Sequence, residues 1–418
     1  MGIRGIGIMN FVYKCSDCGK EYSSDKMIYL CPECRKNQEP GFFQKGVLKT
    51  FLDKDYLKSL KKDQEANPRD FLPYPVPKTA AYPVGNTPLT APYRLREKTA
   101  FSGLYLKNDG VNPSGSLKDR ASLLVAAQAL HFSETMVALA STGNAGSAMA
   151  CAGAAYGLNI VLFVPESAPM AKLMQSVLYG AAVIPVQGTY DQAFSLSIEF
   201  TKQKGGINRN TAYNPLTIEG KKTVSIEIFN QLGGKTPDYM YVPTGDGVIL
   251  AGVYKGFFDL REAGFTERIP KIVCVQAEKS NAVAQAFNSG IMKALERSET
   301  RADSISVASP ANGRMAVEYI HDSGGWVTEV ADEEILQAQL ELNSRAGVLS
   351  EPAAAAAYAG FLKDRGKLRD DETAVVLLTG TGFKDMDSVK DSIIIPESIP
   401  PEIDALEGLS GRIIGSEV

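Results

Sequence analysis

Residues 112–123 read Asn-Pro-Ser-Gly-Ser-Leu-Lys-Asp-Arg-Ala-Ser-Leu. Pro113 and Gly115 favour a loop, and the apolar run from Leu123 predicts a helix, so Lys118 lies near the start of that helix. A helix N-terminus carries partial positive charge and disfavours a cation. A lysine that forms a neutral imine avoids this repulsion. The stretch therefore indicates a nucleophilic amine, although an ordinary surface lysine would explain it equally well if the stretch stood alone.

Three more loops of small residues follow predicted strands. Ser-Thr-Gly-Asn-Ala-Gly-Ser occupies 141–147, Pro-Thr-Gly-Asp-Gly occupies 243–247, and Thr-Gly-Thr-Gly-Phe-Lys-Asp occupies 379–385. The apolar runs before them alternate with helical patterns, which predicts right-handed βαβ units and parallel sheets. Such sheets bind ligands beyond the carboxyl ends of their strands. We therefore expect the three loops and Lys118 to meet at one site.

Together these four motifs resemble those of threonine synthase and its relatives, the fold-type II enzymes that use pyridoxal 5'-phosphate (PLP). The resemblance spans residues 86–385. It implies an α/β fold similar to that of the tryptophan synthase β subunit, with two three-layer αβα lobes. The predicted divisions are a zinc-ribbon-like module at 1–48, an arm and the start of the large lobe at 49–118, a small mobile lobe at 119–205, the rest of the large lobe at 206–390, and a C-terminal strap at 391–418.

The resemblance also implies roles for single residues. Lys118 is the catalytic lysine that binds the cofactor covalently, and Asn144 bonds the ring oxygen of the cofactor. Thr379 faces the pyridine nitrogen. The cofactor phosphate is expected at Gly245, Asp246, Gly247 and Val248, because backbone N–H groups and the dipole of a following helix favour an anion. Singly, each of these loops is more often a plain turn, and Asn144 also suits a helix cap.

Substrate contacts follow from the same resemblance. Hydroxyl and amide donors for the substrate carboxylate are expected at Ser141, Thr142 and Gly143. Contacts to a phosphate or leaving group are expected at Lys107, Ser114, Ser116 and Asn214, with Lys107 equally explicable as a surface residue.

Departures from the family pattern leave the substrate open. Asp246 stands where relatives carry Asn, and a carboxylate repels a phosphate unless it faces away or caps a helix. Asn-Pro-Leu-Thr at 214–217 lacks the arginine with which threonine synthases clamp the phosphate of O-phosphohomoserine. The alternatives are cysteate synthase, which joins sulfite to O-phosphoserine, and a catalytically silent binding protein.

The first four cysteines form a separate pattern. Cys15, Cys18, Cys31 and Cys34 make two C-x2-C pairs twelve residues apart. This spacing is typical of a zinc ribbon, and a module this short needs such a staple to fold. A redox role for the pairs is the weaker alternative.

Composition limits the remaining classes of function. Hydrophobic residues make up 44% of the 418 residues, charged residues make up 22%, and the net charge is −4. This balance gives no electrostatic reason to expect nucleic acid. Because no apolar run reaches membrane-spanning length, we expect a cytoplasmic protein. The resemblance further implies a homodimer. The two histidines, His131 and His321, lie outside the glycine loops, which argues against a histidine-centred site.

Overall fold

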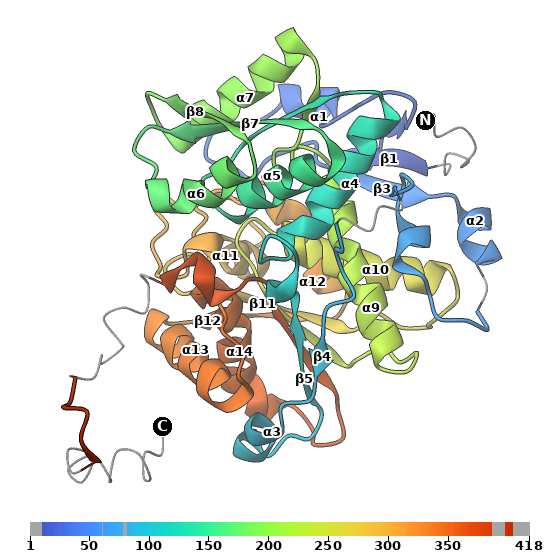
Figure 1. Ribbon diagram of the computed structural model, residues 1–418. Coiled ribbons are helices and arrows are strands. Elements are labelled where there is room, and N and C mark those ends of the chain that lie inside the picture. Colours follow the sequence, from blue (N-terminus) through green and yellow to red (C-terminus); the bar gives the residue numbers. More distant parts are fainter. Residues whose placement is uncertain (1–10, 61, 78–81, 387–397, 404–418) are drawn as a thin grey trace.

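The computed structural model describes residues 11–60, 62–77, 82–386 and 398–403. Two lobes, each built on a largely parallel sheet, are stacked above one another, and a small antiparallel sheet lies beside the upper lobe (Figure 1). The predicted α/β architecture is confirmed. The predicted strap at 391–418 falls largely outside the described residues.

The large lobe contains a six-stranded sheet of order β12-β11-β10-β13-β5-β4. Five strands run parallel, and β4 pairs antiparallel with β5 at the edge. The bounds are β4 Leu89–Thr90, β5 Leu104–Asn108, β10 Tyr239–Pro243, β11 Lys271–Ala277, β12 Trp326–Val330 and β13 Ala374–Leu378.

Side chains alternate along the strands, so both faces of this sheet carry apolar side chains, and helices cover both faces. Tyr241 and Val376 point to the face of α13 (Asp332–Ala346) and α14 (Pro352–Asp364), whereas Met240 and Val375 belong to the core on the face of α10 (Val248–Glu262). The other helices of this lobe are α3 Tyr93–Thr99, α8 Leu216–Glu219, α9 Thr223–Gln231, α11 Ala282–Ser289 and α12 Gly313–Asp322.

The small lobe contains a four-stranded parallel sheet of order β8-β7-β6-β9. Its core lies between the sheet, α4 and α5 on one side, and α7 on the other. The bounds are β6 Met136–Ala140, β7 Asn159–Pro165, β8 Ala182–Val186, β9 Ile207–Asn208, α4 Lys118–His131, α5 Asn144–Tyr156, α6 Met170–Leu178 and α7 Tyr190–Lys204. The sheet therefore continues past the boundary predicted at residue 205.

The N-terminal module is a three-stranded antiparallel sheet of order β2-β1-β3. It comprises β1 Phe11–Cys15, β2 Glu21–Ser23, β3 Leu48–Leu52 and the short helix α1 Pro32–Lys36, followed by α2 Lys54–Ser59. Within residues 41–60 the only helix is α2, and β3 precedes it. Leu48 and Leu52 are buried on one face of β3 and complete the sheet, so pairing with β1 overrides local propensity.

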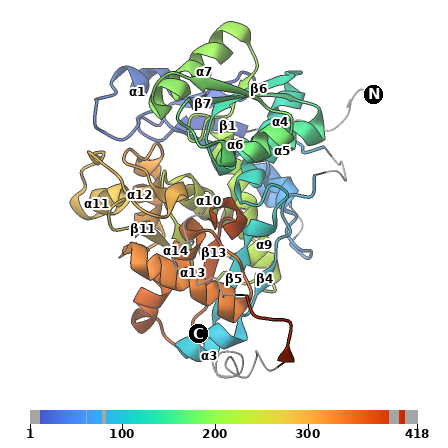
Figure 2. The same cartoon turned by 60° about the vertical axis from the view of Figure 1, so that its left-hand side comes forward.

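This module contacts both lobes, as Figures 1 and 2 show from two sides. The Asn208 N–H at the end of β9 donates to the Tyr29 hydroxyl at 2.9 Å, and the Tyr29 ring stacks on Tyr213. On the large lobe, the Phe43 N–H donates to the Met292 carbonyl at 2.8 Å. The proline-rich arm packs on its own chain, where the Tyr74 ring lies against Phe11 and His131.

Candidate active site

A cavity of about 330 Å³ lies between the lobes, at the ends of β6 and β10. It brings together eight of the residues predicted from the sequence, which are Lys118, Ser141, Thr142, Gly143, Asn144, Gly245, Asp246 and Gly247. Lys118 and the loops 141–147 and 243–247 therefore meet as expected, whereas the loop 379–385 does not line this cavity.

The loop before Lys118 is fixed against the end of β13. The Leu117 N–H donates to the Thr379 carbonyl at 2.8 Å, and Ser116 forms a β-bridge with Gly380. Gly115 has a φ of 89°, and a Cβ there would lie 2.9 Å from the Thr381 side chain. Glycine is thus required for the loop to approach β13. The result places Lys118 at the first position of α4 and Thr379, which is buried, directly beside that loop.

The loop after β6 is capped from within. The Ser141 hydroxyl accepts hydrogen bonds from the N–H groups of Gly143 at 3.3 Å and Gly146 at 3.1 Å. This supports the first turn of α5 and leaves Thr142 and Gly143 on the cavity wall. A Cβ added at Gly143 would meet nothing within 4 Å, so the backbone there faces open space.

Asn144 contacts a carboxylate that the sequence did not single out. Its Nδ2 lies 3.2 Å and 3.0 Å from the two carboxylate oxygens of Glu351. Burial raises the pKa of Glu351, while Lys118 and the Asn144 hydrogen bond act in the opposite direction. Glu351 had been noted only as the residue before the proline that begins α14. A glutamate next to a buried alanine-rich helix was the available signal.

The loop after β10 forms the start of α10. Gly247 has a φ of 83°, and a Cβ there would lie 2.8 Å from the Ala316 Cβ and 2.9 Å from the Asn312 carbonyl oxygen. The Asp246 carboxylate accepts the Val248 N–H at 2.9 Å. Asp246 therefore caps α10, which is the arrangement under which a carboxylate is tolerated in this loop. Val248 is buried and does not line the cavity.

Two predicted substrate contacts have structural roles instead. The Lys107 amine is buried and donates to the Thr87 carbonyl, Glu227 and Gln231 at 2.7, 2.8 and 3.0 Å. These bonds use all three of its donors. The Asn214 amide donates to Gln128 and to the Asn208 carbonyl, both at 2.9 Å. The structure therefore corrects the expectation that Lys107 and Asn214 face the substrate.

Ser114 and Ser116 lie in the loop before Lys118 but do not line the cavity. Both are buried, and neither hydroxyl has a hydrogen-bond partner among the described residues.

Several residues of the site were missed. The cavity is also lined by Tyr190, Thr211, Lys221 and residues 303–307. The Lys384 amine donates to the Ser147 hydroxyl at 2.9 Å and to Gln175, and burial lowers its pKa. Lys384 belonged to the quoted 379–385 loop, so its position was available, whereas nothing in the spacing singles out Lys221.

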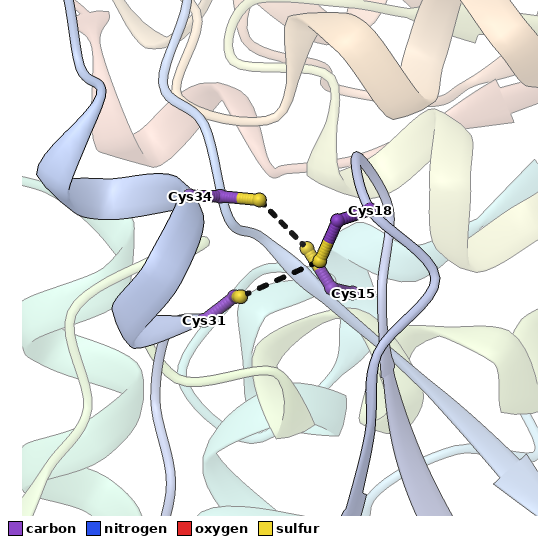
Figure 3. A group of neighbouring side chains, drawn as sticks. All are labelled: Cys15, Cys18, Cys31 and Cys34. Atoms are coloured by element: carbon purple, nitrogen blue, oxygen red, sulfur yellow. Dashed lines mark hydrogen bonds between the residues drawn. The ribbon is translucent and has the colours of Figure 1, made fainter.

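The four N-terminal cysteines converge as predicted (Figure 3). Their sulfur atoms lie within 4.8 Å of one another, with Cys15 to Cys34 at 3.7 Å and Cys18 to Cys31 at 3.8 Å. Four thiolates about 2.3 Å from a tetrahedral Zn²⁺ would be about 3.8 Å apart. The Asp17 N–H lies 3.4 Å from the Cys15 sulfur, and the Tyr22 hydroxyl lies 3.0 Å from the Cys31 sulfur. The cluster thus has the dimensions of a metal site.

The cavity also suits PLP. It has a lysine amine and the first residues of α5 and α10, whose positive ends favour anionic groups of a ligand.

The chain is similar to known proteins. Residues 80–380 match the family model described as "Pyridoxal-phosphate dependent enzyme". A threonine synthase of Methanosarcina acetivorans is 35% identical over 410 residues, covering 96% of this chain and 98% of that protein. The chain belongs to the threonine synthase family. A second member, from Methanocaldococcus jannaschii, is 33% identical and covers 90% of this chain and 93% of its own.

Solved structures show the same fold outside the threonine synthase family. Threonine deaminase isoform 2 of Solanum lycopersicum has a TM-score of 0.64 at 22% identity, covering 74% of this chain and 89% of that one. Maize serine racemase has a TM-score of 0.63 at 20% identity, covering 74% and 91%. The predicted fold-type II architecture is confirmed, and the chain is a PLP-dependent enzyme of the lyase class.

Proposed function

We propose that this enzyme converts O-phosphohomoserine and water to threonine and phosphate. The observation that carries the proposal is the cavity in which the amine of Lys118 shares a wall with the first residues of α5 and α10. Relatives that are named threonine synthase and match nearly the whole chain support the substrate.

The residues of the chain have distinct tasks in this proposal. PLP, when bound, supplies an electron sink for negative charge on the carbons of the substrate. Lys118 holds the cofactor and, once released, moves protons at the reacting carbons. The hydroxyls of Ser141 and Thr142 would orient the substrate carboxylate, because the N–H groups of Ser141 and Gly143 are bonded within the protein. Asn144 and Thr379 would face the cofactor ring, and Gly245, Asp246 and Gly247 before α10 would hold its phosphate, whereas Val248 lies outside the cavity.

A second candidate, cysteate synthase, has one observation in its favour. Thr217, which stands in place of the family's arginine, is buried, and its hydroxyl donates to the Asn214 carbonyl at 2.7 Å. It therefore offers no charge to a substrate phosphate.

Phosphate release separates the two candidates. Purified enzyme loaded with PLP would be incubated with O-phosphohomoserine, with O-phosphoserine, and with O-phosphoserine plus sulfite. The proposal predicts release from O-phosphohomoserine without sulfite. Sulfite-dependent release from O-phosphoserine would replace it with the second candidate. A protein that neither binds PLP nor releases phosphate would be the silent form.

Zn²⁺ at the cysteine cluster is part of the same proposal, with a structural role. The homodimer remains a prediction from the resemblance, and the cytoplasmic location remains a prediction from the hydropathy of the sequence. Among the described residues, no helix has the length and apolar character of a membrane span.

A further inference from the structure

One buried arginine near the cavity has no counter-ion among the described residues. Arg209 follows β9, and its side chain is fully buried. Its Nη1 donates to the Thr211 hydroxyl at 2.9 Å, but Nε and Nη2 have no hydrogen-bond partner among the described residues. Buried guanidinium groups are ordinarily paired, since an unpaired one loses its hydration without compensation. The described part of the folded chain therefore supplies no anion to Arg209.

A second buried basic side chain lies on the same side of the site. Lys221 lines the cavity together with Lys118 and Thr211, and among the described residues its amine donates to the Thr217 carbonyl alone, at 2.7 Å. Burial lowers the pKa of Lys221 well below its usual value, and the nearby charge of Arg209 lowers it further. Burial therefore disfavours the charged form of Lys221, an anionic ligand beside the amine would favour it, and the hydrogens not bonded to Thr217 are available to that ligand.

The nearest carboxylate does not neutralise the two cations. Asp246 attracts both Arg209 and Lys221 electrostatically, but its hydrogen bond goes to the Val248 N–H. Within the described part of the chain, no carboxylate forms an ion pair with either side chain. Asp246 therefore supplies one negative charge opposite two basic side chains, Arg209 and Lys221.

We propose that Arg209 and Lys221 form a subsite for a tetrahedral oxyanion, and that it receives the phosphate group of the substrate. The planar fork of an arginine binds two oxygens of a phosphate, and the lysine adds a point charge. The inference rests on the proposed elimination of phosphate. It also explains how the site works with Thr217 in place of an arginine, because the charge comes from residues 209 and 221 instead.

Binding of inorganic phosphate to the PLP-loaded enzyme tests the subsite without any turnover. Isothermal titration would be carried out on the wild type, Arg209→Met, Lys221→Met and the double variant. We expect phosphate to bind about tenfold more weakly in each single variant and still more weakly in the double variant. Lys202→Met, which removes one charge from the exposed surface of α7, is the matched control and should bind phosphate like the wild type.

Cofactor affinity, measured by PLP absorbance, distinguishes the sources of the oxyanion. The proposal predicts a PLP affinity within about threefold of the wild type. A loss of PLP affinity as large as the loss of phosphate affinity would assign the two cations to the cofactor phosphate and overturn the inference. Tighter binding of sulfite than of phosphate would assign them to an incoming nucleophile, with the same consequence. Unchanged phosphate binding in both variants would also overturn it.

Thermal unfolding shows whether the variants fold. Removing an unpaired buried charge should leave the midpoint unchanged or raise it, whereas phosphate should raise the midpoint of the wild type only. Because this readout needs no substrate, the subsite can stand even if O-phosphohomoserine is not turned over. Conversely, threonine formation with unaltered phosphate binding in the variants would remove the subsite and keep the proposed function.

Discussion

Two groups of buried cations in this enzyme differ in what neutralises them. In the first, the Arg120 guanidinium donates to Asp109 at 2.6 Å and to the two oxygens of Glu227 at 2.6 and 2.8 Å, and Lys107 shares Glu227. In the second, Arg209 and Lys221 have no ion-pair partner among the described residues. Paired charges hold the lobes together, and unpaired charges mark a place for a ligand.

The volume of a cavity does not show whether the charged groups beside it are available to a ligand. The paired group borders a hollow of about 650 Å³, lined by Arg120 and Glu227, whereas the cavity at Lys118 measures about 330 Å³. The smaller cavity contains the chemically available groups. Satisfied hydrogen bonds, and not volume, separate the structural region from the functional one.

The largest expected effect concerns Lys118. Lys118→Ala should lower phosphate release by about a thousandfold or more, because both covalent attachment of the cofactor and proton transfer are lost. The yellow absorbance of lysine-bound PLP should disappear with it. Lys202→Ala is a suitable control. Retained absorbance in Lys118→Ala would mean that another lysine, such as Lys221, binds the cofactor.

Glu227→Gln tests whether the paired group of cations stabilises the fold. It leaves Arg120 and Lys107 buried without their shared carboxylate, so we expect a loss of about 3–5 kcal/mol in the free energy of unfolding. Urea denaturation measures this change, with Glu199→Gln on the exposed face of α7 as the control. A loss below about 1 kcal/mol, within the range of surface ion pairs, would contradict the structural role.

Asp119 makes the stability of the protein depend on pH. It is buried, accepts hydrogen bonds from the Tyr82 hydroxyl at 2.6 Å and the Ser114 N–H at 2.8 Å, and burial raises its pKa from 3.8 to about 6. The folded protein therefore binds this proton more tightly than the unfolded chain. Its contribution to stability is present below pH 3.8 and is lost as the pH rises to about 6.

The Asp119→Asn variant removes this titration. Its free energy of unfolding relative to the wild type should increase between pH 4 and pH 7 by roughly 1–3 kcal/mol. Unfolding curves at four pH values measure the difference. A difference that is independent of pH would show that Asp119 titrates normally.

Metal removal should have the smallest effect on the cavity. Chelation at the four cysteines should expose residues 11–36 to protease, while lysine-bound PLP absorbance changes little, because β1 and α1 do not line the cavity. Phosphate affinity should fall by no more than a few fold, through the hydrogen bond between Tyr29 and Asn208 beside Arg209. An unchanged cleavage pattern would remove the metal from the proposal.

The sequence determined the elements and most of the loops. The strand β6 coincides with an apolar run, α5 begins after Gly143, and α7 begins after the Thr189 cap, since apolar periodicity, glycine and caps act within a few residues. The loops that meet at Lys118 were predictable for the same reason, and the spacing of the four cysteines fixed their convergence.

Only the tertiary structure decided which charges are available. Glu227 is 120 residues from Lys107 and removes it from the site, and Glu351 is 207 residues from Asn144 and joins it. Arg209 and Lys221 look like ordinary basic residues in the sequence. Their significance depends on burial without a counter-ion, which is a property of how segments pack and is not encoded in any local pattern.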